Sequence, residues 1–521
     1  MAVFARGRRL VNNLRALWVL LILWYELGIF IYSVDRGCSW PDASFYSQNS
    51  PSANTDVQPY HILLVADPQI LDHRSYPHRW AILTYLSRVF TDLNLLKNWK
   101  SALRTNPDAI IFLGDMMDGA RFPMSDAEYE RYYARFRRIF KVDSEIPQFF
   151  IPGNHDTGLA VNAPFTPHAR SRYVSHFGEP NNAITVANHT LLLLDAPDIV
   201  EEDQRRVGAK ATYKDWDAIT GGTLDFVNDF MEQRDSLSIH EGRGDPVILF
   251  THIPLHRPDG ANCGPLRERG TIRHGIGPGY QNTLGKETSQ FLLRALRPSL
   301  VFSGDDHDYC EYNHKLDLGQ DRPIELIREV SVKSLSLAMG IRRPGFQLLS
   351  LAPVELSHNR GAGASHKDIP CALPDQLGIY IRAYLPFIFL SIIVLCGSNV
   401  LHHQRTRSRH KFRPVPQPAR ISTRRLHIRL ELDIEEPYME GEHDAGDPSR
   451  ETFTKSTQAR IGLWRATELL ALAVGSICPC FNNVRRPGNP TLLISCWRDI
   501  RDVAAFPLVV FVVITWWTMI H

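Results

Sequence analysis

Six short runs of apolar residues recur along the first two thirds of the chain. Each ends at a residue that can bind a metal ion or at a short turn leading into one. Uninterrupted Val, Ile and Leu runs are typical of strands buried on both faces of a parallel sheet. The runs span residues 62–66, 110–113, 149–151, 191–194, 247–250 and 300–302. Because open α/β sheets carry their chemistry beyond the carboxyl ends of their strands, the pattern predicts a metal-centred hydrolase.

Helical periodicity separates some of these runs. Apolar residues recur at spacings of three and four within residues 80–104 and 126–140, which predicts two helices. Asp195, which ends the fourth run, precedes an Ala-Pro pair and is better explained as a turn or helix cap than as a metal ligand. The predicted architecture is an α/β sandwich of two mixed sheets flanked by helices, with membrane helices at both ends of the chain.

Three longer apolar segments predict membrane-spanning helices at residues 17–34, 377–401 and 503–520. The chain before the first segment is basic, and a second basic stretch opens at Arg405. Because Lys and Arg flanks favour the cytosol, residues 1–16 and 402–502 are predicted to be cytosolic. Residues 35–376, with a folded core at 58–355, are then lumenal in a eukaryotic secretory membrane.

Charged positions refine this topology. Glu26 lies inside the first apolar segment, where a carboxyl group is costly unless it faces a partner helix. Residues 461–480 are apolar but carry Arg465 and Glu468, which favours an interfacial amphipathic helix over a fourth span. A net charge of +2 on 521 residues gives no electrostatic reason to expect a nucleic-acid partner.

Cysteines and a glycosylation triplet agree with a lumenal domain. Four of the eight cysteines fall in the segment predicted to be lumenal, where disulfides persist: Cys38, Cys263, Cys310 and Cys371. Four cysteines allow three pairings, and the sequence does not choose among them. Asn188 begins an N-glycosylation triplet.

The metal-binding residues form a set of ordered blocks. GD-x-x-D occupies residues 114–118, GNHD residues 153–156, a strand-end His stands at 252, and GDDH occupies residues 304–307. Over residues 58–355 the chain resembles the calcineurin-like metallophosphoesterases. The resemblance implies two metal ions held by Asp67 and His307 on one side, by Asn154 and His252 on the other, and by Asp115 between them.

Two positions depart from the general pattern of that family. Gln69 stands where the first block has His, and Asp305 stands where the last block has its first His. Gln69 is expected to orient a bound water, whereas Asp305 is a candidate ligand. Both changes move the site toward oxygen ligands, which favours manganese or magnesium over zinc. The resemblance implies two divalent ions, and the ligand set favours manganese or magnesium.

The chemistry expected of such a site is hydrolysis of a phosphoester. Two divalent ions activate a bridging water and stabilise an in-line displacement at phosphorus. His155 lies beside ligand Asn154 and is the natural proton donor to the leaving alcohol, with Asp156 expected to orient its ring. Asp118 is expected to support the metal ligands from behind.

A narrower resemblance rests on Asp67-Pro68-Gln69, on residues 252–257 and on residues 304–310. These blocks look like those of the GPI-glycan-remodelling phosphodiesterases. The resemblance implies manganese-dependent removal of ethanolamine phosphate from a mannose of a GPI anchor, in the endoplasmic reticulum or early Golgi. The implied partners are a GPI-anchored lipid or protein and receptors for cargo export.

Substrate contacts are a separate prediction. His256 and Arg257 are candidates for binding the substrate phosphate, although a structural role in their loop is nearly as well supported. Asp306, with Asp308, Tyr309 and Glu311, is a hypothetical site for an ethanolammonium group. Two alternatives stay open: hydrolysis of another phosphoester, and a non-catalytic lumenal adaptor in ion homeostasis or cargo export.

Overall fold

The computed structural model describes residues 2–45, 58–159, 165–241, 245–319, 323–352, 365–411 and 491–520. The segment 461–480, predicted to be an amphipathic helix, lies outside the described residues. The chain divides into two compact units, one formed by Met1–Val394 with Ile500–His521 and the other by Leu395–Asp499. Within the second unit, Asn399 Nδ2 donates a hydrogen bond to Asp499 Oδ2 at 2.9 Å.

The first of two large sheets has five strands in the order β13-β12-β1-β2-β3. The strands are β1 (Tyr60–Val65), β2 (Ala109–Phe112), β3 (Gln148–Phe150), β12 (Gly345–Leu351) and β13 (His366–Ala372). β1, β2 and β3 are parallel, whereas β12 runs antiparallel to both of its neighbours. The carboxyl ends of the three parallel strands therefore share one edge.

The second sheet has six strands in the order β10-β11-β9-β6-β5-β4. The strands are β4 (Asn182–Val186), β5 (His189–Leu194), β6 (Val247–Thr251), β9 (Leu300–Ser303), β10 (Cys310–Leu316) and β11 (Glu325–Ser331). The four inner strands are parallel and the two outer strands are antiparallel to them. Both sheets are mixed, as predicted, and all six apolar runs fall on their strands.

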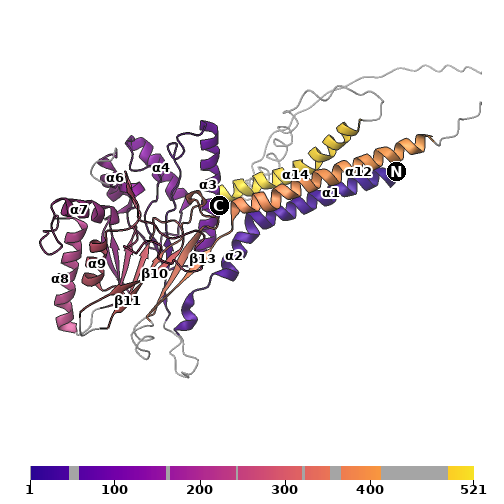
Figure 1. Cartoon of the computed structure of the whole chain (residues 1–521). Helices are drawn as coiled ribbons and strands as arrows, with labels where there is room; N and C mark the ends of the chain where they lie inside the picture. Colours follow the sequence, from indigo (N-terminus) through magenta and orange to yellow (C-terminus); the bar gives the residue numbers. More distant parts are fainter. Residues whose placement is uncertain are drawn as a thin grey trace, which may run out of the picture. The chain divides into compact units, whose positions relative to one another are not determined.

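Helices cover the outer faces of the two sheets (Figure 1). They are α3 (Ala81–Leu103), α4 (Asp126–Ile139), α6 (His168–Phe177), α7 (Ala196–Gly208), α8 (Thr223–Glu241) and α9 (Lys286–Leu296). The one-turn helix α5 (Asn154–Thr157) follows β3. Short elements complete this part: η2 (Pro41–Ser44), β7 (Ile276–Gly277), β8 (Tyr280–Gln281) and η3 (Leu337–Met339). Helices α3 and α4 match the two predicted helices. Asp195 caps α7 by accepting a hydrogen bond from the backbone N–H of Asp198, so it is a cap, as predicted.

Alternating side chains of the strands build separate cores on the two faces of each sheet. Ile62 and Leu64 of β1 join Phe250 and Phe302 of the second sheet in a cluster between the sheets. Leu63, the residue between them, packs on the other face in the cluster that includes side chains of α3 and α4. This packing fixes the register of the strands, and with it the positions of the residues at their ends.

Among the described residues, three helices are long and apolar enough to cross a membrane: Arg8–Ala43, Gln376–Ser408 and Leu492–Ile520. The first begins within α1 (Ala2–Leu23) and continues through the π-helical η1 (Trp24–Gly28), α2 (Ile29–Gly37) and the following turn. The second contains α11 (Gln376–Ile379), η5 (Tyr380–Tyr384) and most of α12 (Leu385–Lys411). The third is α14 (Leu492–Ile520). They contain the three predicted spans and extend beyond them into the charged flanks. In the first unit, Ile22, Ile379 and Ile514 form a joint apolar cluster of the three helices.

Two disulfides settle the pairing that the sequence left open. Cys38 bonds to Cys371, which ties the end of α2 to β13, and Cys263 bonds to Cys310. The Cα atoms of the two pairs are 5.5 Å and 4.3 Å apart. The first bond joins the first membrane helix covalently to the part of the chain that contains the two large sheets.

Candidate metal centre

Strand ends from both sheets bring three potential metal ligands together. Asp67 follows β1, Asp115 follows β2 and His252 follows β6. One ligand atom from each of them lies within 4.8 Å of the others, and all three residues are buried. The approach is close because the parallel strands of each sheet end at the same edge. The first, second and fifth apolar runs therefore lead to the residues of this cluster.

His252 is oriented as a metal ligand. Its Nδ1 lies 2.7 Å from the carbonyl oxygen of Leu113, which accepts the hydrogen bond from that nitrogen when it carries the proton. Nε2 then presents its lone pair to three oxygens, at 3.1 Å from Asn154 Oδ1, 3.5 Å from Asp115 Oδ1 and 3.6 Å from Asp305 Oδ1. A backbone carbonyl that fixes the tautomer in this way is typical of metal-binding histidines.

Asn154 also presents its ligand atom to the cluster. Its Nδ2 donates a hydrogen bond to the carbonyl oxygen of Gly279 at 2.8 Å, so Oδ1 is the atom that faces His252. Residue 279 belongs to the long loop between β6 and α9. This loop therefore helps to determine which end of the amide reaches the site.

Without a bound cation, the cluster has an excess of buried carboxylates. Burial raises the pKa of Asp67 well above its ordinary value. The neighbouring carboxylates of Asp115 and Asp305 also raise this pKa, whereas His252 lowers it. Oδ2 of Asp67 is buried without a hydrogen-bond partner among the described residues. A buried carboxylate oxygen that lacks a donor is the kind of atom that a metal ion satisfies. The residues present therefore fit divalent metal ions.

The backbone around the cluster is held in an unusual conformation. Five residues of the predicted site have left-handed backbone angles, with φ between 29° and 68°: Asp67, Gln69, Asp115, Asp305 and His307. Non-glycine residues adopt this region rarely, and they cluster at functional sites where the surrounding structure enforces it. Gly153 has a different reason to be glycine, because a Cβ there would lie 2.1 Å from Asp115 Oδ1.

The two residues that depart from the family pattern lie in the site. Gln69 Nε2 donates a hydrogen bond to Asp115 Oδ2 at 2.8 Å, so the amide holds a candidate bridging ligand. Asp305 faces His252, and its backbone N–H donates to Asp67 Oδ1 at 3.1 Å. His307 lies close enough to Asp305 and Asp115 for their charges to act on it, although burial lowers its pKa overall.

The structure corrects the expected partner of His155. Its Nδ1 lies 3.2 Å from Asp118 Oδ1, whereas Asp156 accepts hydrogen bonds from the backbone N–H groups of Gly153, Met116 and Met117. Asp118, and not Asp156, therefore orients the ring. Although burial alone lowers the pKa of His155, Asp115 and Asp118 raise it to about 9, which suits a proton donor.

Arg121 is a site residue that the sequence analysis missed. Its Nη2 lies 3.3 Å from His155 Nε2, and its Nη1 donates to the carbonyl oxygens of Gly279 at 2.8 Å and Asn154 at 3.2 Å. Its Nε is buried without a partner in the part of the chain that the structure describes. The only sequence signal is its place three residues after Asp118. A guanidinium here is well suited to bind a phosphoryl oxygen.

Two of the predicted substrate contacts have partners outside the metal-binding cluster. Arg257 is 1% exposed and lies 2.8 Å from Glu329 Oε2, so it has the structural role named as the alternative. His256 stacks on the ring of His274, with 4.7 Å between the ring centroids.

The acidic residues proposed to bind ethanolammonium already have cationic partners. Asp306 pairs with Arg267, Glu311 with Arg328, and Asp308 with Lys333. Carboxylates neutralised in this way are poor receptors for another cation, so the structure argues against that hypothesis.

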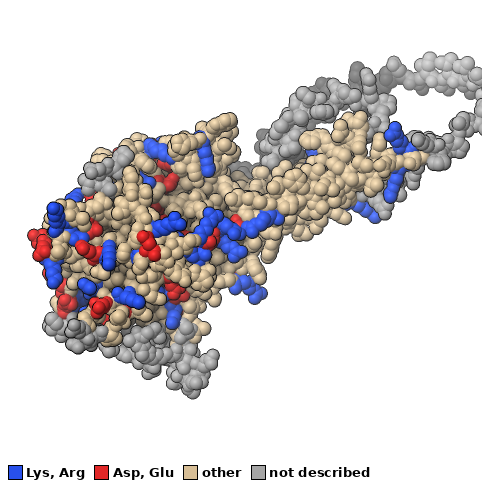
Figure 2. Space-filling view, viewed as in Figure 1, with Lys and Arg blue, Asp and Glu red and all other residues tan. Residues whose placement is uncertain are grey.

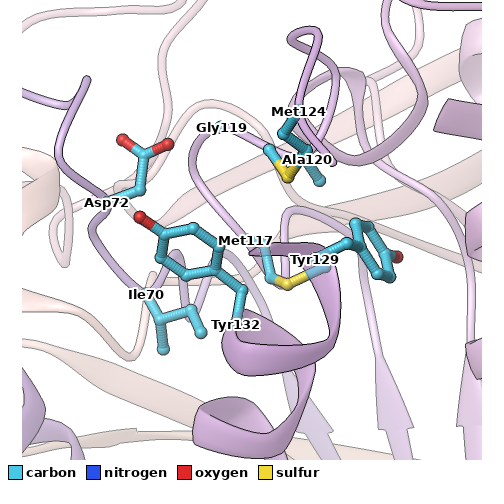
Figure 3. A pocket seen from close by; sticks show the side chains of 8 residues that line it. All are labelled: Ile70, Asp72, Met117, Gly119, Ala120, Met124, Tyr129 and Tyr132. Atoms are coloured by element: carbon cyan, nitrogen blue, oxygen red, sulfur yellow. The ribbon is translucent and has the colours of Figure 1, made fainter. Parts of the chain in front are cut away.

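A small pocket lies behind the GD-x-x-D loop (Figure 3). Its lining is mostly apolar and includes Met117, Tyr129 and Tyr132, with the carboxylate of Asp72 beside the Tyr132 hydroxyl. A Cβ on Gly119 would lie 2.1 Å from Asp72 Oδ2, so only glycine fits at this turn. The pocket therefore belongs to the support of the loop that carries Asp115 and Asp118.

Sequence comparison agrees with this geometry. The calcineurin-like phosphoesterase profile matches residues 60–309. The chain belongs to this family and, with its buried metal-binding cluster, is a metallophosphoesterase that hydrolyses phosphoesters.

Its similarity to particular proteins extends beyond the shared domain. Cell division control protein 1 of Saccharomyces cerevisiae is 32% identical over 387 residues, which cover 72% of each chain. Metallophosphoesterase 1 of Ailuropoda melanoleuca is 24% identical over 415 residues, which cover 75% of this chain and 91% of that protein. A Metallophosphoesterase 1 homolog of Drosophila melanogaster is 23% identical over 328 residues, or 62% of this chain and 78% of that one. These matches confirm the family predicted from the motifs.

Proposed function

We propose that the protein is a phosphodiesterase that uses two divalent ions, with manganese preferred, to remove ethanolamine phosphate from a mannose of GPI anchors. The main support for the proposal is the buried cluster of Asp67, Asp115 and His252. Its buried carboxylates are suited to bind cations. Asn154 and Asp305 add oxygen atoms to this cluster. An oxygen-rich ligand set favours manganese or magnesium.

The residues around the cluster have distinct roles in the proposed reaction. Bound metal ions supply the activated water and polarise the phosphoryl group. Arg121 binds a phosphoryl oxygen, and His155 donates its proton to the mannose oxygen as the bond to phosphorus breaks. Asp118 keeps the ring of His155 in position through its hydrogen bond to Nδ1.

The membrane helices and the disulfides support a substrate in the lumenal leaflet of the endoplasmic reticulum or early Golgi. The catalytic part lies between helices that are apolar enough to cross a membrane, which keeps the site near a lipid head group. The four cysteines of the predicted lumenal segment form the disulfides Cys38–Cys371 and Cys263–Cys310. Cys396 and Cys496, which lie in α12 and α14, are free. Disulfides persist in oxidising compartments such as this lumen, which supports the topology predicted from the basic flanks.

Mass spectrometry of GPI glycans tests the proposal. The detergent-solubilised full chain is incubated with GPI glycolipid and manganese, beside an Asp115→Asn variant and an Asp126→Asn control, whose side chain is 90% exposed. Loss of one ethanolamine phosphate from a mannose with the wild type and the control, and not with Asp115→Asn, supports the substrate. Hydrolysis of a soluble phosphodiester without any change in the glycan would keep the enzyme and discard this substrate.

A further inference from the structure

The first two turns of α3 carry an exposed apolar surface. Five large side chains at its start are at least half exposed: Trp80 (78%), Ile82 (66%), Leu83 (50%), Tyr85 (61%) and Leu86 (54%). Residues 82, 85 and 86 follow the spacing of one helix face. We call these five residues the α3 tip. Exposed apolar patches of this density on a folded domain mark a surface that binds another apolar phase.

The rest of α3 packs against the membrane helices of the same unit (Figure 1). Lys97 forms an ion pair with Glu26, inside the first predicted span, and Lys100 donates a hydrogen bond to the carbonyl oxygen of Thr518 near the end of α14. Phe90 contacts Tyr380, with 5.7 Å between ring centroids. The contact with Lys97 explains why a carboxyl group is tolerated at position 26.

These contacts place α3 at the level of the membrane boundary. Glu26 lies eight residues before the end of the predicted span at residue 34, so its partner Lys97 lies within about 12 Å, along the helix axis, of the point where that span ends. The α3 tip is about three to five turns further along the same helix. This apolar surface therefore belongs to the helix that packs against the three membrane helices.

The composition of the α3 tip and its flanks matches a lipid interface. Trp and Tyr concentrate where the acyl chains meet the head groups, because their rings are apolar with a polar edge. His78, Arg79 and Arg88 flank the apolar residues, and basic side chains bind lipid phosphates. Figure 2 shows Lys and Arg side chains on the face of the catalytic part nearest to α2.

A short segment connects the α3 tip to the metal centre. Residues 68–79 run from candidate ligand Asp67 to Trp80. This segment is fastened to the GD-x-x-D loop by the pairing of Ile70 with Met117. The hydroxyl of Ser75 lies 3.1 Å from Asp72 Oδ1 and stabilises the turn before the helix. The segment therefore connects the α3 tip to the loop that carries candidate ligand Asp115.

We propose that the α3 tip inserts into the boundary between head groups and acyl chains, in the leaflet next to the catalytic part, as a membrane contact in addition to the three helices. The contact fixes the height of the metal centre above the lipid surface. On the proposed function, it also holds a lipid-borne phosphodiester within reach of the site; this second part rests on that function, whereas the insertion does not.

Fluorescence quenching by spin-labelled lipids tests the insertion without any activity measurement. The full chain carries a fluorescent amino acid at position 83 and is reconstituted in phosphatidylcholine vesicles with nitroxides at the head group or at shallow or deep acyl positions. We expect the strongest quenching from the shallow acyl label. The matched control carries the probe in place of Leu326, which is 65% exposed on β11 and far in sequence from the spans. Quenching at position 83 that is no stronger than at 326 would overturn the proposal, including the case in which a protein partner covers the surface.

A pair of substrates tests the consequence for catalysis. In an Ile82→Ser, Leu86→Ser variant we expect hydrolysis of a GPI glycolipid in vesicles to fall at least about threefold, because membrane affinity scales with the apolar area buried. Hydrolysis of soluble bis(p-nitrophenyl) phosphate should stay unchanged, as should both activities of a Val207→Ser control, whose side chain is 58% exposed on α7. An equal loss on both substrates, or no loss on the glycolipid, would overturn the positioning role. Failure of the wild type to cleave the glycolipid would contradict the proposed function and leave the quenching result to decide the insertion.

Discussion

His155 Nδ1 lies 3.2 Å from the carboxylate of Asp118 and 2.6 Å from the carbonyl oxygen of the same residue. A single aspartate therefore contacts the ring nitrogen through both its side chain and its backbone. This arrangement fixes the ring plane and leaves Nε2 on the side of Arg121 and the metal cluster. Asp156, which follows His155 in sequence, accepts hydrogen bonds from the backbone N–H groups of Met116, Met117 and Gly153.

Substitution of Asp118 should slow proton donation and leave metal binding intact. We expect Asp118→Asn to lower kcat by about 10- to 100-fold with little change in KM, since an orienting partner of a catalytic ring contributes on this scale. The loss should be largest for alkyl phosphodiesters and small for p-nitrophenyl esters, whose leaving group needs no proton. An equal loss for both leaving groups would contradict the role of the pair.

The matched variant Asp156→Asn should behave differently. The Asp156 carboxylate accepts two backbone hydrogen bonds that join the GNHD turn to the GD-x-x-D loop and a third from Gly153 within the turn. The loss of this carboxylate loosens two loops that carry metal ligands. We therefore expect reduced metal content, a lower melting temperature and reduced activity on both leaving-group classes. Normal metal content and stability in this variant would contradict the structural role of Asp156.

Arg121 should have the phosphate-binding role that sequence reasoning gives to Arg257, and Arg257 should have a structural role. We expect Arg121→Met to lower kcat/KM by about 10- to 100-fold through the loss of a charged hydrogen bond to the phosphoryl group, with partial recovery in Arg121→Lys. Arg257→Met instead removes the guanidinium that pairs with buried Glu329 and leaves this carboxylate with His314 as its one ion-pair partner among the described residues, which should cost at most roughly 3 to 5 kcal/mol of stability. Thermal unfolding and steady-state kinetics of the folded fraction separate the two effects. A stable Arg257→Met protein with a raised KM would reverse the assignment.

His366 should make the catalytic part sensitive to acid. Burial, with a contribution from His189, lowers its pKa to about 4. The lowered pKa means that the folded state favours the neutral ring. The contribution of His366 to the stability of the fold is therefore fully present above the pKa of histidine in the unfolded chain, about 6.5. As the pH falls from there toward 4, the unfolded chain takes up a proton that the folded chain does not, and stability drops by at most about 3 kcal/mol.

Thermal unfolding between pH 7 and pH 4 tests this sign. A His366→Gln variant should lose less stability than the wild type over that interval, because its side chain does not titrate. Parallel curves for the two proteins would show that His366 does not contribute.

The strands and most of the candidate ligands were predictable because a local signal marks each of them. An apolar run followed by Asp115 or His252 carries its meaning within a few residues. The partners of these residues were not predictable, since they are set by tertiary packing. Asp118 and His155 are 37 residues apart. Asp306 was predicted to bind substrate because the sequence does not show that Arg267, from another loop, neutralises it.

The disulfide pairing and Arg121 show the same limit. Three pairings of four cysteines are equivalent in sequence, and only the fold brings Cys38 at the end of α2 to β13. Arg121 reaches the site because Gly279, in a loop more than 150 residues away, supplies a carbonyl oxygen that holds its side chain. Neither contact has a local signature.

Metal analysis of the purified full chain tests the central claim most directly. After incubation with manganese and removal of free ions, elemental mass spectrometry should find about two divalent ions per chain. The Asp115→Asn variant should lose most of them together with hydrolysis of bis(p-nitrophenyl) phosphate, while Asp126→Asn keeps both. A wild-type chain that binds no divalent metal, or an Asp115→Asn variant that hydrolyses the ester at the wild-type rate, would contradict the account.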